Sequence, residues 1–257
     1  EIDLWYMNIF KKVWRTMTRQ IKNTKESFSK AVAKQFSGLK VNEENIKEAL
    51  LKLGYDAEKA NEWTDEQIFD FSRALRKLTK PMIIAANKID RHDAKDNLKK
   101  LREAYPETMI IPCSADSELA LREANSLGLI EYVPGEKDFK IIKANDKQKG
   151  ALELIKNSVI DIYGSTGVQE ILNKAVFDLL GHIAVFPAGT HKLMDSEGRV
   201  LPDCFLMPKG STALDFAFKL HTDIGKNFVR AVNVKTKQSL GKDYKLNHRD
   251  AIEILTR

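Results

Sequence analysis

Cysteine is scarce in this 257-residue chain, and no metal-binding pattern accompanies it. The two cysteines, Cys113 and Cys204, have neither paired nor metal-type spacing and no companion histidines. Such thiols are normally reduced and buried in proteins of the reducing cytosol. The histidines also form no ligand pattern: His92, His182, His191, His221 and His248. We therefore expect no metal site and a cytoplasmic location.

Long apolar runs are lacking as well. No run approaches the ~18–20 residues that cross a bilayer, and no signal-peptide pattern opens the chain. The first residue is Glu1 rather than Met, and the chain begins inside a helical pattern. We therefore expect the sequence to be part of a longer protein. Its length is sufficient for two or three small domains, each with its own core.

A phosphate-binding loop is the third absence. Phosphoryl transfer by a nucleotide hydrolase needs a G-x-x-x-x-G-K-[ST] loop for the phosphates and a hydroxyl for Mg²⁺. The Gly-Lys pairs in Gly225–Asn227 and Gly241–Asp243 lack both the hydroxyl and the upstream glycine. We interpret the D-x-x-G strings at Asp161–Gly164 and Asp195–Gly198 as accidental, because they lie at a helix end and in a hairpin turn. No catalytic residue is predicted, and this chain alone should hydrolyse nothing.

The net charge of +6 is modest but unevenly distributed. Residues 11–40 contain nine Lys or Arg and one acid, Glu26, whereas residues 182–257 contain twelve Lys or Arg and eight acids. The region between them, 81–181, is slightly acidic. Two basic ends suggest a polyanionic partner such as RNA, although a solvated basic face would give the same pattern.

Residues 1–80 are predicted to be helical throughout. Over thirty residues pass before Gly38 without Gly or Pro, which indicates a projecting helical hairpin or short coiled coil. An ordinary helical packing unit is the simpler alternative. Further helices are expected at about Glu43–Leu53, with Asn42 as N-cap, and Asp65–Leu78. Apolar residues recur at three- and four-residue steps, as on one helix face, at Trp5, Ile9, Phe10, Val13, Met17, Ile21, Phe28, Val32 and Phe36.

Residues 81–181 alternate between strands and helices. Met82–Ala86 is wholly apolar, as in a parallel strand covered on both faces, and Thr108–Pro112 is the next strand. This order predicts part of a doubly wound α/β sheet. The segment Val133–Lys143 should be a loop. Helices are expected at Asp93–Ala104, Asp116–Leu127, Asp146–Tyr163 and Val168–Leu180.

Residues 182–257 are predicted to form a small α+β domain. Short β-type runs at Ile183–Phe186, Phe205–Met207 and Val229–Val234 are separated by turn residues. One amphipathic helix, capped by Ser211 or Thr212, interrupts them and should end near His221. We interpret Gly164–Gly167, which contains two hydroxyls without a nearby base, as a turn between helices.

The first strand of the α/β region ends in a group of residues suited to a guanine base. Open α/β sheets bind ligands at the carboxyl ends of their strands, where Asn87, Lys88 and Asp90 lie. Guanine presents two adjacent donors, N1–H and the N2 amine, and a carboxylate such as Asp90 accepts from both. Adenine has an acceptor at N1 and no N2 amine, so it would leave the carboxylate unsatisfied at a cost of ~1–3 kcal/mol. The methylenes of Lys88 can lie along the base plane.

The second strand supplies the other predicted residues of the site. Ser114 and Ala115 follow it directly and can direct a backbone N–H towards guanine O6 while bracing the Asp90 loop. The pattern N-K-x-D alone is weak, but the strand before it and the Cys-Ser-Ala strand end after it strengthen the interpretation. The alternative is that Asn87 and Asp90 start a turn and cap a helix.

These motifs resemble those of a known family. The run AANKID followed by PCSA is similar to the fourth and fifth motifs of the translation-factor-class GTPases. Three C-terminal blocks, Val185–Gly189, Asp195–Phe228 and Gly241–Leu255, resemble the TGS domain, a ubiquitin-like β-grasp module. Together with a helical insertion before the fourth motif, they resemble the YchF/Obg-like GTPases, particularly archaeal members. The likeness covers essentially the whole chain.

The resemblance implies a helical insertion (1–80), the C-terminal half of a P-loop GTPase domain with a parallel sheet (81–181) and a TGS domain (182–257). Many related members carry a changed base-reading motif and prefer ATP, whereas the intact motif here favours GTP and GDP. In the family the phosphate and Mg²⁺ ligands precede the insertion, so they would belong to the parent protein.

The implied partner is the ribosome or tRNA. The TGS surface would contact it through four basic side chains, namely Lys209, Lys219, Lys226 and Arg230. A different class of function is also open: a non-enzymatic RNA- or ribosome-binding module in which the α/β region is only a scaffold.

Overall fold

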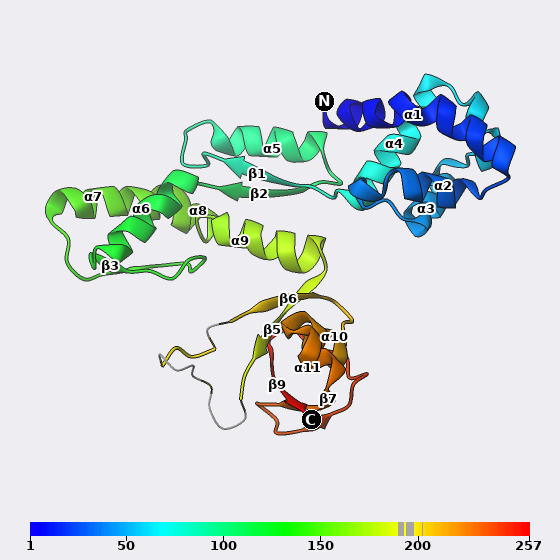
Figure 1. The fold of residues 1–257 in the computed structure, drawn as a ribbon. Helices are drawn as coiled ribbons and strands as arrows, with labels where there is room; N and C mark the ends of the chain where they lie inside the picture. The colour runs from blue at the N-terminus through cyan, green and yellow to red at the C-terminus, as the bar shows by residue number, and fades with distance from the viewer. Residues whose placement is uncertain (190–192, 194–197, 202) are drawn as a thin grey trace. The chain divides into compact units, whose positions relative to one another are not determined.

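The structure, a computed structural model, describes residues 1–189, 193, 198–201 and 203–257. The chain separates into two compact units, Glu1–Met82 and Ile83–Arg257 (Figure 1). His191 and the start of the string Asp195–Gly198 lie outside the described residues. Within the described ranges, no helix is both long enough and apolar enough to cross a membrane.

The first unit is helical. Two of its helices begin as predicted, because the side chains of Asn42 and Thr64 accept hydrogen bonds from the N–H groups of Asn45 and Gln67 in capping boxes. Its elements are α1 (Ile2–Thr24), α2 (Phe28–Gln35), the 3-10 helix η1 (Ser37–Leu39), α3 (Glu43–Leu53), the 3-10 helix η2 (Ala57–Glu62) and α4 (Asp65–Thr79).

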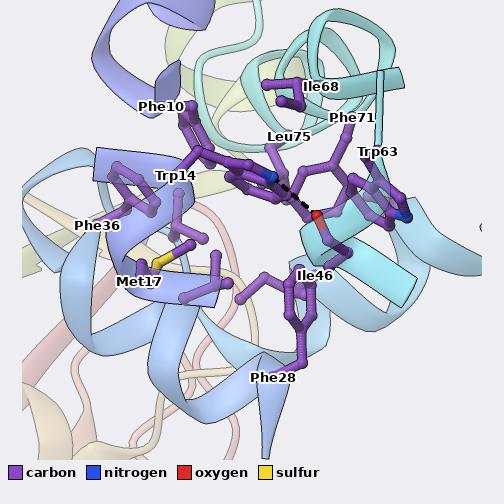
Figure 2. Close-up of a cluster of buried hydrophobic side chains, with 14 of the residues drawn as sticks. Phe10, Trp14, Met17, Phe28, Phe36, Ile46, Trp63, Ile68, Phe71 and Leu75 are labelled. Atoms are coloured by element: carbon purple, nitrogen blue, oxygen red, sulfur yellow. Dashed lines mark hydrogen bonds between the residues drawn. The ribbon is translucent and has the colours of Figure 1, made fainter. Parts of the chain in front are cut away.

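One aromatic core joins these helices (Figure 2). The rings of Trp14 and Trp63 stack with centroids 5.3 Å apart, and Phe71 meets both rings edge-on. The buried indole Nε1 of Trp14 donates to the carbonyl of Ala60 at 3.0 Å, the dashed line in Figure 2. The Trp14 ring thus adds apolar contact without leaving its polar atom unsatisfied.

Residues 1–36 form two helices and not one continuous span. The helix α1 stops at Thr24, and Lys25 adopts a left-handed conformation with φ of +55°. Between Ile21 and Phe28 no residue continues the apolar face, so the helix loses the packing that would stabilise a longer span. Phe28 and Phe36 instead pack in the same core as α1, which gives the simpler compact helical unit.

The second unit begins with a parallel pair of strands, as predicted. The strand β1 (Ile83–Asn87) pairs with β2 (Met109–Cys113), and their last residues, Asn87 and Cys113, are partners in the register. Helix α5 (Ala94–Ala104) makes the crossover, and α6 (Ala115–Ser126) follows β2. The predicted α/β class of this region is confirmed.

The expected coverage of β1 on both faces is not found. Met82, just before the strand, is 42% exposed, Ile83 and Ile84 are half-buried, and Ala85 is exposed. Within the described part of the chain β1 pairs only with β2. The partner strand β2 buries Ile110, Ile111 and Cys113, so the partial burial is specific to β1 and not common to the pair.

The remainder of the α/β region holds a small ribbon and two interrupted helices. The strand β3 (Ile130–Glu131) pairs antiparallel with β4 (Lys140–Ile141), which lies in the segment expected to be a loop. Pairs of two residues are too short to leave an alternating pattern in the sequence. The helical segments are α7 (Asp146–Ile155), the π-helix η3 (Lys156–Ile160), α8 (Asp161–Tyr163), α9 (Val168–Asn173) and the π-helix η4 (Lys174–Leu179).

The C-terminal region is a five-stranded mixed sheet with the order β6-β5-β9-β7-β8. The strands β5 and β9 are parallel and the other pairs are antiparallel. Phe216 of α10 is fully buried in a core shared with Val185 and Ile252, as expected for a β-grasp arrangement. The elements are β5 (His182–Pro187), β6 (Phe205–Pro208), α10 (Ala213–Leu220), α11 (Thr222–Lys226), β7 (Phe228–Asn233), β8 (Ser239–Leu240) and β9 (Asp250–Thr256).

Candidate nucleotide-binding site

The two loops predicted to form the site lie at one edge of the parallel pair. Asn87 and Cys113 end their strands side by side, so the residues that follow them must meet. Lys88 turns the chain with φ of +68°, and the buried Ile89 returns it, because its N–H donates to the carbonyl of Cys113 at 3.3 Å. The Asp90 loop is thus held at the end of β2 by a backbone hydrogen bond and by the buried side chain of Ile89.

Asp90 and Ser114 are joined directly. The Ser114 hydroxyl lies 2.8 Å from Asp90 Oδ1 and also 2.8 Å from the Ser117 hydroxyl. A hydroxyl has one hydrogen, and an ionised carboxylate can only accept, so Ser114 donates to Asp90 and accepts from Ser117. Asp90 itself is exposed, and no described residue bonds its second oxygen, Oδ2. The carboxylate is therefore held in place while it retains acceptor capacity for a ligand.

Asn87 is oriented by donors on both sides. Its Oδ1 accepts from the N–H of Lys88 at 2.8 Å and from the N–H of Ala115 at 3.0 Å. These two donors require the oxygen to face them, which leaves the Nδ2 amine directed elsewhere. No acceptor among the described residues takes the hydrogens of Nδ2. Asn87 therefore ties the two loops together, and its Nδ2 amide hydrogens are left without an acceptor among the described residues.

The backbone donors of the second loop are arranged differently from the expectation. The N–H of Ser114 donates to the carbonyl of Thr166 at 2.9 Å, and the N–H of Ala115 is taken by Asn87. Neither N–H faces open space towards a purine oxygen. Asp116, at the next position of α6, has an N–H without an acceptor among the described residues. Asn87 Nδ2 and the Asp116 amide are thus two donors near the loops without an acceptor among the described residues.

The turn at Gly164–Gly167 has a role that sequence reasoning missed. It joins α8 to α9, as predicted, but Thr166 is also fully buried beneath the Ser114 loop. Its hydroxyl donates to the carboxylate of Glu118, which is itself 4% exposed. The only signal in the sequence was the Thr166 hydroxyl next to a glycine of the turn, and it did not identify Glu118 as the hydrogen-bond partner.

Glu118 is a buried carboxylate surrounded by donors. Besides Thr166, it accepts from Tyr132 Oη at 2.7 Å and from Arg122 Nε at 2.6 Å. Burial acts to raise the pKa of Glu118, but the hydrogen bonds from Thr166, Arg122 and Tyr132, with the charge of Arg122, outweigh it and hold this pKa below its ordinary value. Burial, and the bond to Glu118, raise the pKa of Tyr132. The carboxylate is therefore ionised and fully hydrogen-bonded.

A depression of about 460 Å³ lies beside the first loop, between Asn87, Lys88 and the side of α5. Asp90, Ser114 and Ala115 do not line it. Only Asn87, of the two residues with polar groups suited to a base, borders this depression, whereas Asp90 lies outside it. Across the described ranges, no three His, Cys, Asp or Glu side chains converge as a metal site would require.

The four basic residues predicted for RNA contact are all exposed but do not share one face. Lys219 and Lys226 lie on α10 and α11, and Lys209 lies in the turn after β6. In β7 the neighbour of Arg230 is Ala231, which is buried in the core beneath α10. Successive side chains of a strand point to opposite faces, so Arg230 lies on the sheet face away from the helices.

Comparison with family models divides the second unit into two matches. Residues 85–189 match the model described as Obg-like GTPase YGR210-like, G4 motif-containing domain. Residues 193–256 match the TGS domain. The first match contains all five predicted base-site residues, and the second contains all four predicted RNA-contact residues.

Similar proteins of known sequence or structure carry GTP-binding descriptions. The chain is 42% identical to an uncharacterised GTP-binding protein of Methanocaldococcus jannaschii over its whole length, which is 64% of that protein. It is 29% identical over 83% of its length to an uncharacterised GTP-binding protein of Schizosaccharomyces pombe, covering 54% of it. The chain thus spans less than two thirds of these relatives.

The chain also resembles a solved structure along its entire length. The crystal structure of a GTP-binding protein from Pyrococcus horikoshii OT3 matches it with a TM-score of 0.74 and 40% identity. The match covers 100% of this chain and 69% of that one.

Proposed function

The chain belongs to the YGR210-like family of Obg-like GTPases, and we propose that it supplies the part of a guanine-nucleotide site that reads the base. The ligands are GTP and GDP. Asp90 reads the base. Asn87 and Ser114 hold the Asp90 loop in position, and Lys88 and Ala115 border the base. The description of the relatives as GTP-binding proteins supports the proposal.

The observation that carries the proposal is the bond between Ser114 and Asp90 across two parallel strands, 2.8 Å long. It fixes a carboxylate at the sheet edge with unused acceptor capacity. The N1–H and N2 amine of guanine are two adjacent donors that match this group. An adenine would place an acceptor, N1, against it and leave the carboxylate unpaired.

Substitution of Asp90 by Asn tests this assignment. An amide presents a donor to the base and should shift the preference from guanine to xanthine, which has an acceptor at position 2. Binding of GMP, XMP and AMP to the 257-residue chain is measured by amide chemical-shift titration. Asp93→Asn is the matched control, because Asp93 is an exposed acid of the same loop. An unchanged preference for GMP in D90N would overturn the base-reading role.

The phosphates and Mg²⁺ are proposed to be held by residues that this chain does not contain. A phosphate-binding loop sequence is absent from the chain, so its own hydrolysis should be negligible. Tight, Mg²⁺-dependent GTP binding to the 257-residue chain would contradict this point. The intact protein is proposed to be a cytoplasmic GTPase.

The partner is proposed to be RNA, on the ribosome or as tRNA. The exposed positions of Lys209, Lys219 and Lys226, with Arg230 on the other sheet face, support a polyanionic partner. The basic residues between Lys11 and Lys40 offer a second such surface.

A non-enzymatic RNA-binding module, with the α/β region as scaffold, is favoured only by this charge distribution. Limited proteolysis of the full-length protein separates the two functions. GTP and GDP, but not ATP, should protect it if the base site is used. Equal cleavage with all three nucleotides would favour the scaffold.

A further inference from the structure

The buried carboxylate of Glu118 has more donors than an ordinary structural ion pair. Thr166, Tyr132 and Arg122 all donate to it, at 2.5, 2.7 and 2.6 Å. Two of these donors, Thr166 and Tyr132, share one oxygen, Oε2. An ionised carboxylate is well suited to this place, because it accepts from three donors without presenting a hydrogen of its own.

The same residues hold the backbone of Ser114 from both sides. The carbonyl of Thr166 accepts the Ser114 N–H at 2.9 Å, while the Ser114 carbonyl accepts the N–H of Glu118 at 3.1 Å. The backbone N–H of Ser114 is therefore bonded to Thr166, and its backbone carbonyl is bonded to Glu118. Its side chain is left to hold Asp90.

The two ends of this network are far apart in sequence. Thr166 is 48 residues from Glu118 and belongs to the turn between α8 and α9, whereas Glu118 and Ser114 belong to the start of α6. Thr166, Ser114 and Glu118 are 0%, 0% and 4% exposed, so water does not compete for these bonds. The turn is thereby bonded to the loop that carries the base-reading contacts.

We propose that Glu118 and Thr166 are positioning residues for guanine recognition, acting through the Ser114 backbone on Asp90 and on the start of α6. The inference rests on the proposed function of Asp90. It adds a determinant of nucleotide affinity that touches no part of the nucleotide. The network holds Ser114 where its hydroxyl meets Asp90 and where the Asp116 amide remains free for the ligand.

The experiment compares variants of the 257-residue chain by amide chemical-shift titration with GMP. Thr166→Val removes the hydroxyl but keeps the shape of the side chain. Glu118→Gln replaces one carboxylate oxygen by an amide NH₂ group, which faces a donor where an acceptor is needed. Each should raise the Kd about five- to tenfold, as expected for one lost buried hydrogen bond. Each should also speed hydrogen exchange of the Ser114 amide. Thr166→Ser, which restores the donor, should return both values to within about twofold of the wild type.

One control and one further test variant separate positioning from general stability. Glu123→Gln removes an exposed charge from the same helix, α6, and should change neither Kd nor exchange. Tyr132→Phe removes one donor from Glu118 with the ring retained, and it serves as the second test if E118Q does not fold. It should weaken GMP binding in the same direction.

The outcomes distinguish the positioning role from the base site on which it rests. Folded T166V and Y132F variants that bind GMP as the wild type does would overturn the positioning role and leave the base site standing. A wild-type chain whose Asn87–Asp90 and Ala115–Asp116 amides do not respond to GMP would overturn the base site, and the positioning role with it. Weaker binding by T166V with rescue by T166S supports both.

Discussion

Gly167 lies so close to Pro112 that a Cβ on the glycine would collide with the Pro112 carbonyl oxygen. Gly167 also has φ of +78°, in the left-handed region that disfavours other residues. The turn after α8 is thus packed against β2 by its backbone, next to the bond between Thr166 and Ser114. Glycine at this position lets the turn approach the strand that ends in the candidate site.

The first prediction concerns this contact. Gly167→Ala should lower the free energy of unfolding by about 2–4 kcal/mol, because overpacking and a left-handed backbone both contribute. Urea denaturation gives the value. The matched control is Gly164→Ala in the same turn, where φ is +84° but an added methyl group would meet nothing within 4 Å. It should cost only about 1–2 kcal/mol. Equal losses in both variants would show that the Pro112 contact has no energetic role.

The second prediction concerns pH. Desolvation raises the pKa of Glu118, but the three hydrogen bonds and the charge of Arg122 together lower it by more, so the folded-state pKa is below the ordinary value of 4.5. Such a group stabilises the fold fully above the unfolded-state pKa, and the stabilisation is lost as the pH falls through the lower folded-state pKa. Glu118→Gln should therefore be less stable than the wild type at pH 7, and the difference should narrow below about pH 4.5.

Urea unfolding at several pH values measures how the difference in unfolding free energy between E118Q and the wild type narrows. Glu123→Gln, on the exposed face of α6, should show a small difference that hardly depends on pH. A gap between E118Q and wild type that stays constant down to acid pH would exclude an ionised, stabilising Glu118.

The base-reading loops could be predicted because they follow general rules of sheet topology. An apolar strand, a crossover helix and a second apolar strand imply parallel pairing, and parallel strands bring their carboxyl ends to one edge. Asn87, Asp90 and Ser114 follow those ends directly, so their proximity depends on local pattern. The capping box at Asn42 is equally local.

The supporting network could not be predicted, because its contacts depend on tertiary packing. Nothing in the local sequence connects Thr166 with Glu118, and a lone Glu on α6 is more typical of a surface residue. The orientation of the Ala115 N–H towards Asn87 also depends on how two loops meet. Likewise β9 lies in the middle of its sheet, and its pairing with β5 and β7 rather than its own pattern defines it.

A third prediction compares two ion pairs in the helical unit. Arg76 Nε donates to Asp3 Oδ1 at 2.7 Å, and the Arg76 side chain is only 7% exposed. Asp3→Ala would leave a buried guanidinium without its acceptor and should cost about 1–3 kcal/mol in the free energy of unfolding. Lys11→Ala breaks the exposed pair with Asp65 and should cost about 0–1 kcal/mol. Chemical denaturation of both variants measures the contrast, and a smaller loss for D3A than for K11A would contradict it.

The fourth prediction uses the two faces of the C-terminal sheet. Each lysine that neutralises one phosphate of single-stranded RNA contributes about 0.7 to the slope of log K against log salt. If the helices α10 and α11 face the RNA, Lys219→Ala and Lys226→Ala should each weaken binding uniformly across sequences and reduce this slope by about 0.7. Arg230→Ala, on the opposite sheet face, should leave the slope unchanged. Fluorescence anisotropy with a labelled single-stranded RNA at several salt concentrations gives the slopes. A reduced slope for R230A alone would assign the contact to the open sheet face, and unchanged slopes in all three variants would remove this domain from the RNA interface.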